Sequence, residues 1–221
     1  MAAEKILTQN QKKVLEAVST NSGICRDFYL TGGIALAGFY LHHRLSEDLD
    51  FFSEKEVDSQ AIFIFFKSIS KKCGFKKVDF KQSFNRNLFF LHFKNGEIIK
   101  TEFTYYPFPR IERKNKISWL FIDSLIDIAV NKIFTIYQNP RSRDFIDLYF
   151  ILKDKKWRLD GLIKKAKIKF DWHIDPIQLG SQLLRVREVK DYPRMIKEIN
   201  PNEWQKFFVG EAKKIDKQIF K

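Results

Sequence analysis

The chain has 221 residues, of which 44% are hydrophobic and 30% charged, so it can build a folded core and is not of the disordered class. No run of 18 apolar residues occurs and the first residues lack an apolar stretch, so we expect neither a membrane span nor a secretory signal. Cys25 and Cys73 form no metal-binding or disulfide pattern, and we expect reduced thiols in a cytoplasmic protein. The formal net charge of +13 favours a polyanionic partner such as nucleic acid, although a soluble basic surface would carry the same charge.

Helix and strand patterns alternate in the first half of the chain. Apolar spacing indicates helices and period-two alternation indicates strands, and Asn95-Gly96 is typical of a hairpin turn. In chain order, the patterns predict a helix over 9–20, a strand over 27–31, a helix over 34–41, a strand over 45–52, a helix over 58–72, and strands over 75–81, 87–94 and 97–106.

The second half of the chain has a helical pattern. We expect one helix over 120–138 and a second over 140–153, with Asn139 as its N-cap and Pro140 in its first turn. Further helical runs follow, with breaks expected at Trp172, Pro176, Pro193 and Pro201. The predicted fold class is α+β, with a mixed α/β domain over 1–115 and a basic helical domain over 116–221.

An acidic pair stands inside the predicted strand over 45–52. On a strand, Ser46, Asp48 and Asp50 project from one face. Two carboxylates a few ångströms apart repel by about 1–4 kcal/mol unless a positive charge lies with them. Mg²⁺ (or Mn²⁺) would fit, because such ions take carboxylate oxygens and keep positions for phosphate, whereas a solvated strand face is the alternative.

A diglycine, Gly32-Gly33, stands between the predicted strand over 27–31 and the helix over 34–41. Glycines let a ligand approach the backbone closely, and the start of a helix offers N–H groups to an anion. A simple tight turn would use the same residues. Together with the acidic strand, however, the diglycine indicates a site where phosphates and metal ions meet.

A third carboxylate is expected from another strand. Glu102 lies within an apolar strand pattern, and it could complete a two-metal site and act as general base toward an attacking hydroxyl. The alternative is a surface glutamate paired with Lys100.

One lysine interrupts an apolar helix face. At 100° per residue, Lys132 shares its face with Leu125, Ile128 and Ile136, where a charge is costly unless it is paired or reaches solvent. A triphosphate or a carboxylate would supply the partner. Asp144 and Asp147 share a face of the next predicted helix, and Asp147 could orient Lys132 or hold a nucleotide.

These segments resemble a known family. Thr-Gly-Gly-Ile-Ala-Leu over 31–36 and the stretch 43–52 closely resemble the AbiEii/AbiGii abortive-infection toxins, nucleotidyltransferases of the DNA polymerase beta superfamily. The resemblance extends to Tyr-Pro-Phe-Pro over 106–109, to Lys132, and to Arg-Asp-Phe-Ile-Asp-Leu-Tyr over 143–149. Ile34 departs from the pattern, because the family usually has threonine or serine there.

The resemblance implies a two-lobed fold, with a mixed-sheet lobe and a helical lobe that hold a metal-bound nucleoside triphosphate (NTP). It implies that Asp48 and Asp50 bind the metal and that Lys132 neutralises the triphosphate. Gly32, Gly33 and Ser46 would cradle the phosphates. It also implies transfer of a nucleotide to RNA, with tRNA as the expected acceptor, in a bacterial toxin–antitoxin system with an antitoxin encoded alongside.

The expected reaction is an in-line attack of the acceptor hydroxyl on the α-phosphorus, with release of pyrophosphate. We expect the basic helical lobe to hold the RNA, since residues 153–169 contain eight Lys or Arg against two acids, and Trp157 and Phe170 could stack on bases. A solvated helix face is the alternative reading of that run. Two other functions stay open: transfer to a protein or small molecule, and a degenerate module that binds nucleotide or RNA without turnover.

Overall fold

The computed structural model describes residues 6–113, 115–117 and 120–219, which divide into two compact units. The first unit runs to Pro109 and also takes in Arg113–Ser124, whereas the second consists of Arg110–Glu112 and the chain from Leu125 onward. The predicted boundary after residue 115 therefore differs from the observed one. The reason is that two short strands beyond Pro109 extend the sheet of the first unit.

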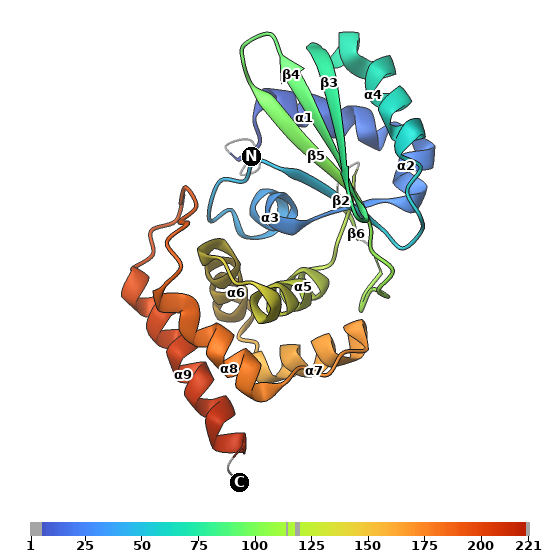
Figure 1. The fold of residues 1–221 in the computed structure, drawn as a ribbon. Coiled ribbons are helices and arrows are strands. Elements are labelled where there is room, and N and C mark those ends of the chain that lie inside the picture. The colour runs from blue at the N-terminus through green and yellow to red at the C-terminus, as the bar shows by residue number, and fades with distance from the viewer. Residues whose placement is uncertain (1–5, 114, 118–119, 220–221) are drawn as a thin grey trace. The chain divides into compact units, whose positions relative to one another are not determined.

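A seven-stranded mixed sheet forms the first unit, in the order β3-β4-β5-β2-β1-β7-β6 (Figure 1). Strand β2 is antiparallel to β1 and parallel to β5, so these three strands lie side by side near the middle of the sheet. The strands are β1 (Tyr29–Thr31), β2 (Leu49–Ser53), β3 (Phe75–Ser83), β4 (Arg86–Phe93), β5 (Ile98–Tyr105), β6 (Asn115–Ile117) and β7 (Leu120–Ile122).

The two longest helices of the first unit begin at recognisable capping residues. Thr8 forms a capping box with Gln11 at the start of α1 (Gln9–Ser19), and Asp58 caps α4 (Ser59–Cys73). Helix α4 packs Phe66 against Phe89 and Phe103 of the sheet, which forms the aromatic part of the core. In chain order, three shorter helices stand between α1 and α4: α2 (Ser22–Asp27), α3 (Gly32–Ala35) and the π-helix η2 (Leu36–Leu41).

Two predicted elements of this unit are corrected by the structure. Strand β2 begins at Leu49, so Ser46 and Asp48 precede the strand and do not share a strand face with Asp50. Residues 120–122 form β7 and the helix begins only at Leu125, because Ile122 pairs with both Leu30 and Asn115 in the sheet. A run of apolar residues is compatible with a buried strand or a buried helix, and here pairing in the sheet makes residues 120–122 a strand.

The second unit is helical. Helix α5 (Leu125–Gln138) contacts α6 (Ser142–Lys155), α7 (Leu159–Phe170) and α8 (Pro176–Leu184). A short 3-10 helix, η3 (Arg185–Arg187), follows, and α9 (Pro201–Ile219) packs on α6 and α8. Phe145 of α6 contacts Trp204 and Phe208 of α9 in the core.

Helix α6 does not start as predicted. Its N-cap is Arg141, not Asn139, and the Arg141 side chain makes no capping hydrogen bond. Instead the backbone N–H of Ser142 donates to Asp191 Oδ1 at 2.8 Å, a cap that comes from a distant part of the chain. Pro176 and Pro201 act at helix starts, where a missing N–H costs little. Within the described residues, no helix is both long and apolar enough to cross a membrane.

Candidate active site

Three neighbouring strands bring Thr31, Asp50 and Glu102 together. Thr31 at the end of β1 is the register partner of Asp50 on β2, and Asp50 is the register partner of Glu102 on β5. Register partners on adjacent strands point to the same face of a sheet. The predicted neighbourhood of Asp50, Glu102 and the diglycine is therefore present in the first unit.

The diglycine turn is packed closely against the acidic residues. Gly32 has φ +70°, and a Cβ built at Gly32 would lie 2.5 Å from Asp50 Oδ2. A Cβ built at Gly33 would lie 2.6 Å from Arg44 Nη2 and 2.8 Å from Ser46 Oγ. The position of Gly32 therefore requires glycine, whereas a side chain at Gly33 would displace the ends of the Arg44 and Ser46 side chains. The predicted Gly32, Gly33, Ser46 and Asp50 cluster is formed.

The residue before the diglycine is held in place by hydrogen bonds. Thr31 Oγ1 donates to Asp123 Oδ2 at 2.8 Å, and both side chains are buried. Tyr40 Oη donates to the Asp123 backbone oxygen at 2.8 Å. These contacts join the end of β1 to the chain just after β7, so the turn is anchored from both directions. Ile34, the departure from the family pattern, is completely buried.

Glu102 is paired with an arginine that sequence reasoning missed. Arg86 of β4 donates through Nε and Nη2 to the two carboxylate oxygens at 2.7 and 2.6 Å. Thr104 Oγ1 donates to the same carboxylate at 2.8 Å. Burial alone would raise the pKa of Glu102, but the bonds from Arg86 and Thr104 outweigh it and hold the pKa below its usual value.

Asp48 is paired with the lysine considered as a partner for Glu102. Lys100 Nζ lies 2.6 Å from Asp48 Oδ2, so Lys100 serves the first acid and Arg86 the third. The alternative of a surface Glu102 paired with Lys100 is therefore wrong, because Glu102 is buried and paired with Arg86. No signal in the sequence pointed to Arg86, because its pairing depends on the register between β4 and β5.

The donor atoms at this place suit a hard divalent cation. Asp48 and Asp50 offer carboxylate oxygens, and Gly32 places no side chain of its own against the Asp50 carboxylate. Among the residues that the structure describes, however, no three His, Cys, Asp or Glu side chains are grouped to hold a metal ion. A metal would therefore compete with Lys100 for Asp48 and with Arg86 for Glu102.

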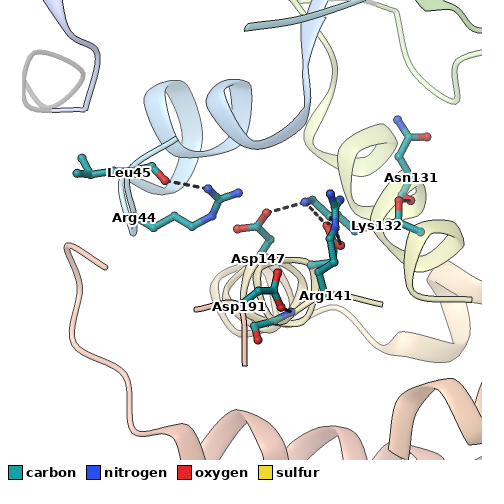
Figure 2. A network of polar contacts seen from close by, with 10 residues as sticks. Arg44, Leu45, Asn131, Lys132, Arg141, Asp147 and Asp191 are labelled. Atoms are coloured by element: carbon teal, nitrogen blue, oxygen red, sulfur yellow. Dashed lines mark hydrogen bonds and ion pairs between the residues drawn. The ribbon is translucent and has the colours of Figure 1, made fainter. Parts of the chain in front are cut away.

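The second unit contains the predicted lysine, and its partners are carboxylates. Lys132 Nζ lies 2.7 Å from Asp144 Oδ1 and 2.8 Å from Asp147 Oδ2, and both aspartates are completely buried (Figure 2). Arg141 Nε adds a bond of 2.8 Å to Asp144 Oδ2. The positive charges of Lys132 and Arg141 thus balance the negative charges of Asp144 and Asp147. These four residues form one cluster.

The cations Lys132 and Arg141 keep Asp144 of this cluster ionised. Burial alone would raise the pKa of Asp144, but the charge of Lys132 and the hydrogen bond and charge of Arg141 lower it further than burial raises it. Asp144 is consequently ionised at neutral pH, and its contribution to stability is lost only as the pH falls through its lowered pKa.

The predicted stacking role of Phe170 is wrong. Phe170 is buried and stacks on Phe134 of α5, with ring centroids 4.0 Å apart, so its ring fills the core. Lys169, counted in the basic run, is also buried and pairs with Asp127 at 2.7 Å. Lys164, Lys165 and Lys167 on α7 are exposed, so part of the basic run does reach solvent.

A family model and a relative each match most of the chain. The family model described as "Nucleotidyl transferase AbiEii toxin, Type IV TA system" matches residues 13–216. An uncharacterised protein of Aquifex aeolicus is 34% identical over 213 residues, covering 94% of this chain and 96% of that protein.

Two solved structures share the fold. JHP933 from Helicobacter pylori has a TM-score of 0.62 at 21% identity, covering 95% of this chain and 90% of that chain. MenT4, a nucleotidyltransferase toxin from Mycobacterium tuberculosis, has a TM-score of 0.59 at 14% identity, covering 92% of this chain and 80% of that chain.

Proposed function

Since the chain belongs to the AbiEii family of nucleotidyltransferase toxins of type IV toxin–antitoxin systems, we propose that it transfers a nucleotide from an NTP to RNA. The proposed acceptor is tRNA and the proposed cofactor is Mg²⁺, with Mn²⁺ as a substitute. A cognate antitoxin is the proposed protein partner. One observation carries the proposal: the diglycine turn lies directly against Asp50, whose strand partner is Glu102.

In the first unit, the proposed roles follow from position. Gly32 and Gly33 let the triphosphate approach the backbone, and Ser46 Oγ beside Gly33 donates to a phosphate oxygen. Asp48 and Asp50 hold the metal. When bound, Mg²⁺ would offset the charge of the triphosphate and of the leaving pyrophosphate.

Glu102 is proposed as the third carboxylate and as the acceptor of the proton from the attacking RNA hydroxyl. Its lowered pKa keeps it ionised at neutral pH, so it is ready to accept a proton. Arg86 holds the carboxylate by both oxygens. A carboxylate accepts about four hydrogen bonds, so the hydroxyl can approach Oε2 beside the bond from Arg86 Nη2.

In the second unit, we propose that Lys132 contacts the triphosphate while Asp144 and Asp147 fix its position. A lysine ammonium has three protons, and two of them reach Asp144 and Asp147. The third can reach a phosphate oxygen. Because both carboxylates bind the Lys132 ammonium, they fix the direction in which its remaining N–H points.

The acceptor is proposed from charge. The net charge of +13 and the exposed lysines of α7 attract a polyanion such as RNA. A protein acceptor would not need this excess of positive charge. An acceptor assay separates these cases directly.

The test incubates purified protein with Mg²⁺, unfractionated tRNA and each of the four α-³²P-labelled NTPs in turn. The expected result is label on RNA with one preferred nucleotide, abolished by Asp48→Ala and by EDTA. Label on added protein and not on RNA would contradict the RNA acceptor. Absence of label together with absent NTP binding would contradict the enzymatic proposal itself.

A further inference from the structure

The tip of the β3–β4 hairpin carries an aromatic residue in a costly position. Ser83 and Arg86 are register partners, so Phe84 and Asn85 form a two-residue turn. Phe84 is 97% exposed and has φ +51°, a left-handed conformation that glycine, asparagine and aspartate adopt far more readily. Exposure of the ring and backbone strain both cost stability, so folding alone does not account for phenylalanine here.

The charge around this tip suits nucleic acid. The hairpin segment Phe75–Arg86 contains more basic than acidic residues, and its single acid, Asp79, pairs with Lys77. Lys81, three residues before Phe84, is exposed on β3, whereas the exposed Lys76 stands near the other end of that strand. Lysines on an edge strand also discourage strand pairing between molecules, which explains the lysines but leaves the exposed ring unexplained.

The hairpin also leads to the acidic residues of the candidate active site. Leu88 of β4 is the register partner of Glu102, and Arg86, two residues nearer the tip, holds the Glu102 carboxylate. The four-residue step from Leu88 to Phe84 spans about 13 Å. That length corresponds to about four stacked nucleotides at about 3.4 Å each.

We propose that Phe84 stacks on an unpaired base of the RNA acceptor, a few nucleotides from the end that reacts, while Lys81 contacts its phosphates. The inference rests on the proposed function, because it assigns a binding position for that RNA. Stacking on a π-face needs no particular base, so the hairpin would position the strand without reading its sequence.

The experiment measures binding by fluorescence anisotropy, without NTP, using a fluorescein-labelled single-stranded RNA of mixed sequence and the same strand with abasic nucleotides. Phe84→Asn removes the ring and also relieves the turn, so loss of binding cannot be attributed to misfolding. Phe84→Trp keeps a stacking surface. Ile98→Asn, an exposed apolar residue on β5, is the matched control.

The expected result is that Phe84→Asn weakens binding of the normal strand by about 5- to 100-fold and leaves the abasic strand unchanged. Phe84→Trp and Ile98→Asn should bind as the wild type does. Equal binding by Phe84→Asn and the wild type, or an equal loss on the abasic strand, would overturn the inference. So would a wild type that binds no RNA.

Because the assay contains no NTP, its outcome is separate from that of the proposed function. If binding depends on Phe84 but no nucleotide is transferred in the presence of Mg²⁺ and NTP, only the proposed transfer fails. If transfer occurs and is insensitive to Phe84→Asn at low RNA concentration, only the stacking position fails.

Discussion

Position 32 requires a left-handed backbone and the absence of a Cβ atom, and glycine meets both requirements. Its φ is +70° and a Cβ would collide with Asp50 Oδ2. We predict that Gly32→Ala abolishes nucleotide transfer, because the turn must move away from Asp50. The change should also destabilise the fold by about 1–2 kcal/mol through the left-handed backbone. Transfer rate and denaturant midpoint are measured together.

Gly74 is the matched control. It also has a positive φ, +90°, at the end of α4, but a Cβ there would meet nothing within 4 Å. Gly74→Ala should therefore lose similar stability and keep its transfer activity. Equal activities of the two variants would show that the close approach of Gly32 to Asp50 has no functional role.

Arg86 is predicted to control the titration of Glu102. In Arg86→Met the opposing effect of burial is less well compensated, so the pKa of Glu102 should rise. In the wild type, the stability from ionised Glu102 is complete above its unfolded pKa of about 4.3 and is lost as the pH falls through the lowered folded value. Carbon-13 NMR titration of labelled glutamate measures the shift, and an unchanged pKa in Arg86→Met would contradict this assignment.

Among the elements, α5 and α7 are joined by a buried ion pair that also holds the loop Arg110–Glu112. Asp127 and Lys169 have completely buried side chains and lie 2.7 Å apart, and Asp127 accepts hydrogen bonds from the backbone N–H groups of Ile111 and Glu112. Burial alone would raise the pKa of Asp127, but Lys169 and these N–H groups lower it overall. The pair therefore ties together three segments of the second unit.

We predict that Asp127→Asn destabilises the protein by about 3–5 kcal/mol, because Lys169 is left as an uncompensated buried charge. Equilibrium denaturation at several pH values measures this. The difference from the wild type should be constant above about pH 5 and shrink at lower pH, as Asp127 itself is protonated. Asp160→Asn, at an exposed pair of α7, is the control and should leave the midpoint unchanged. A wild-type midpoint in Asp127→Asn would contradict the prediction.

The sequence predicted most elements because their signals are local. Thr8 and Asp58 cap α1 and α4 as a helix start requires, and the strand pattern predicted β3, β4 and β5 within a few residues. Two errors have a common cause. The strand β7 and the cap from Asp191 depend on partners far away in the chain, which apolar spacing cannot report.

The candidate site was predictable in its residue types but not in its pairing. Local motifs located Gly32, Asp50 and Lys132, because each interrupts a regular pattern. The partners of the charged groups follow from strand register and helix packing. Arg86 on Glu102 and Asp144 on Lys132 therefore required the structure, whereas the expected contact of Asp147 with Lys132 is confirmed.

For the molecule as a whole, the net charge of +13 predicts that RNA binding weakens steeply with salt. The exposed lysines Lys164, Lys165 and Lys167 of α7 should contribute, so replacing all three with glutamine should make the slope of log affinity against log salt shallower. The expected change is about 0.7 for each phosphate that these lysines neutralise in the wild type. Lys71→Gln with Lys72→Gln at the end of α4 is the control. Identical slopes in the two variants would remove α7 from the RNA-binding surface.

Asp50, beside the diglycine turn, is proposed to support transfer of a whole nucleotide. The most direct measurement is the intact mass of a defined RNA after incubation with Mg²⁺ and the preferred NTP, for the wild type and for Asp50→Asn. We expect a mass gain of one or more nucleoside monophosphates with the wild type and none with Asp50→Asn. A gain of phosphate alone, or the same nucleotide gain with Asp50→Asn, would contradict this proposal.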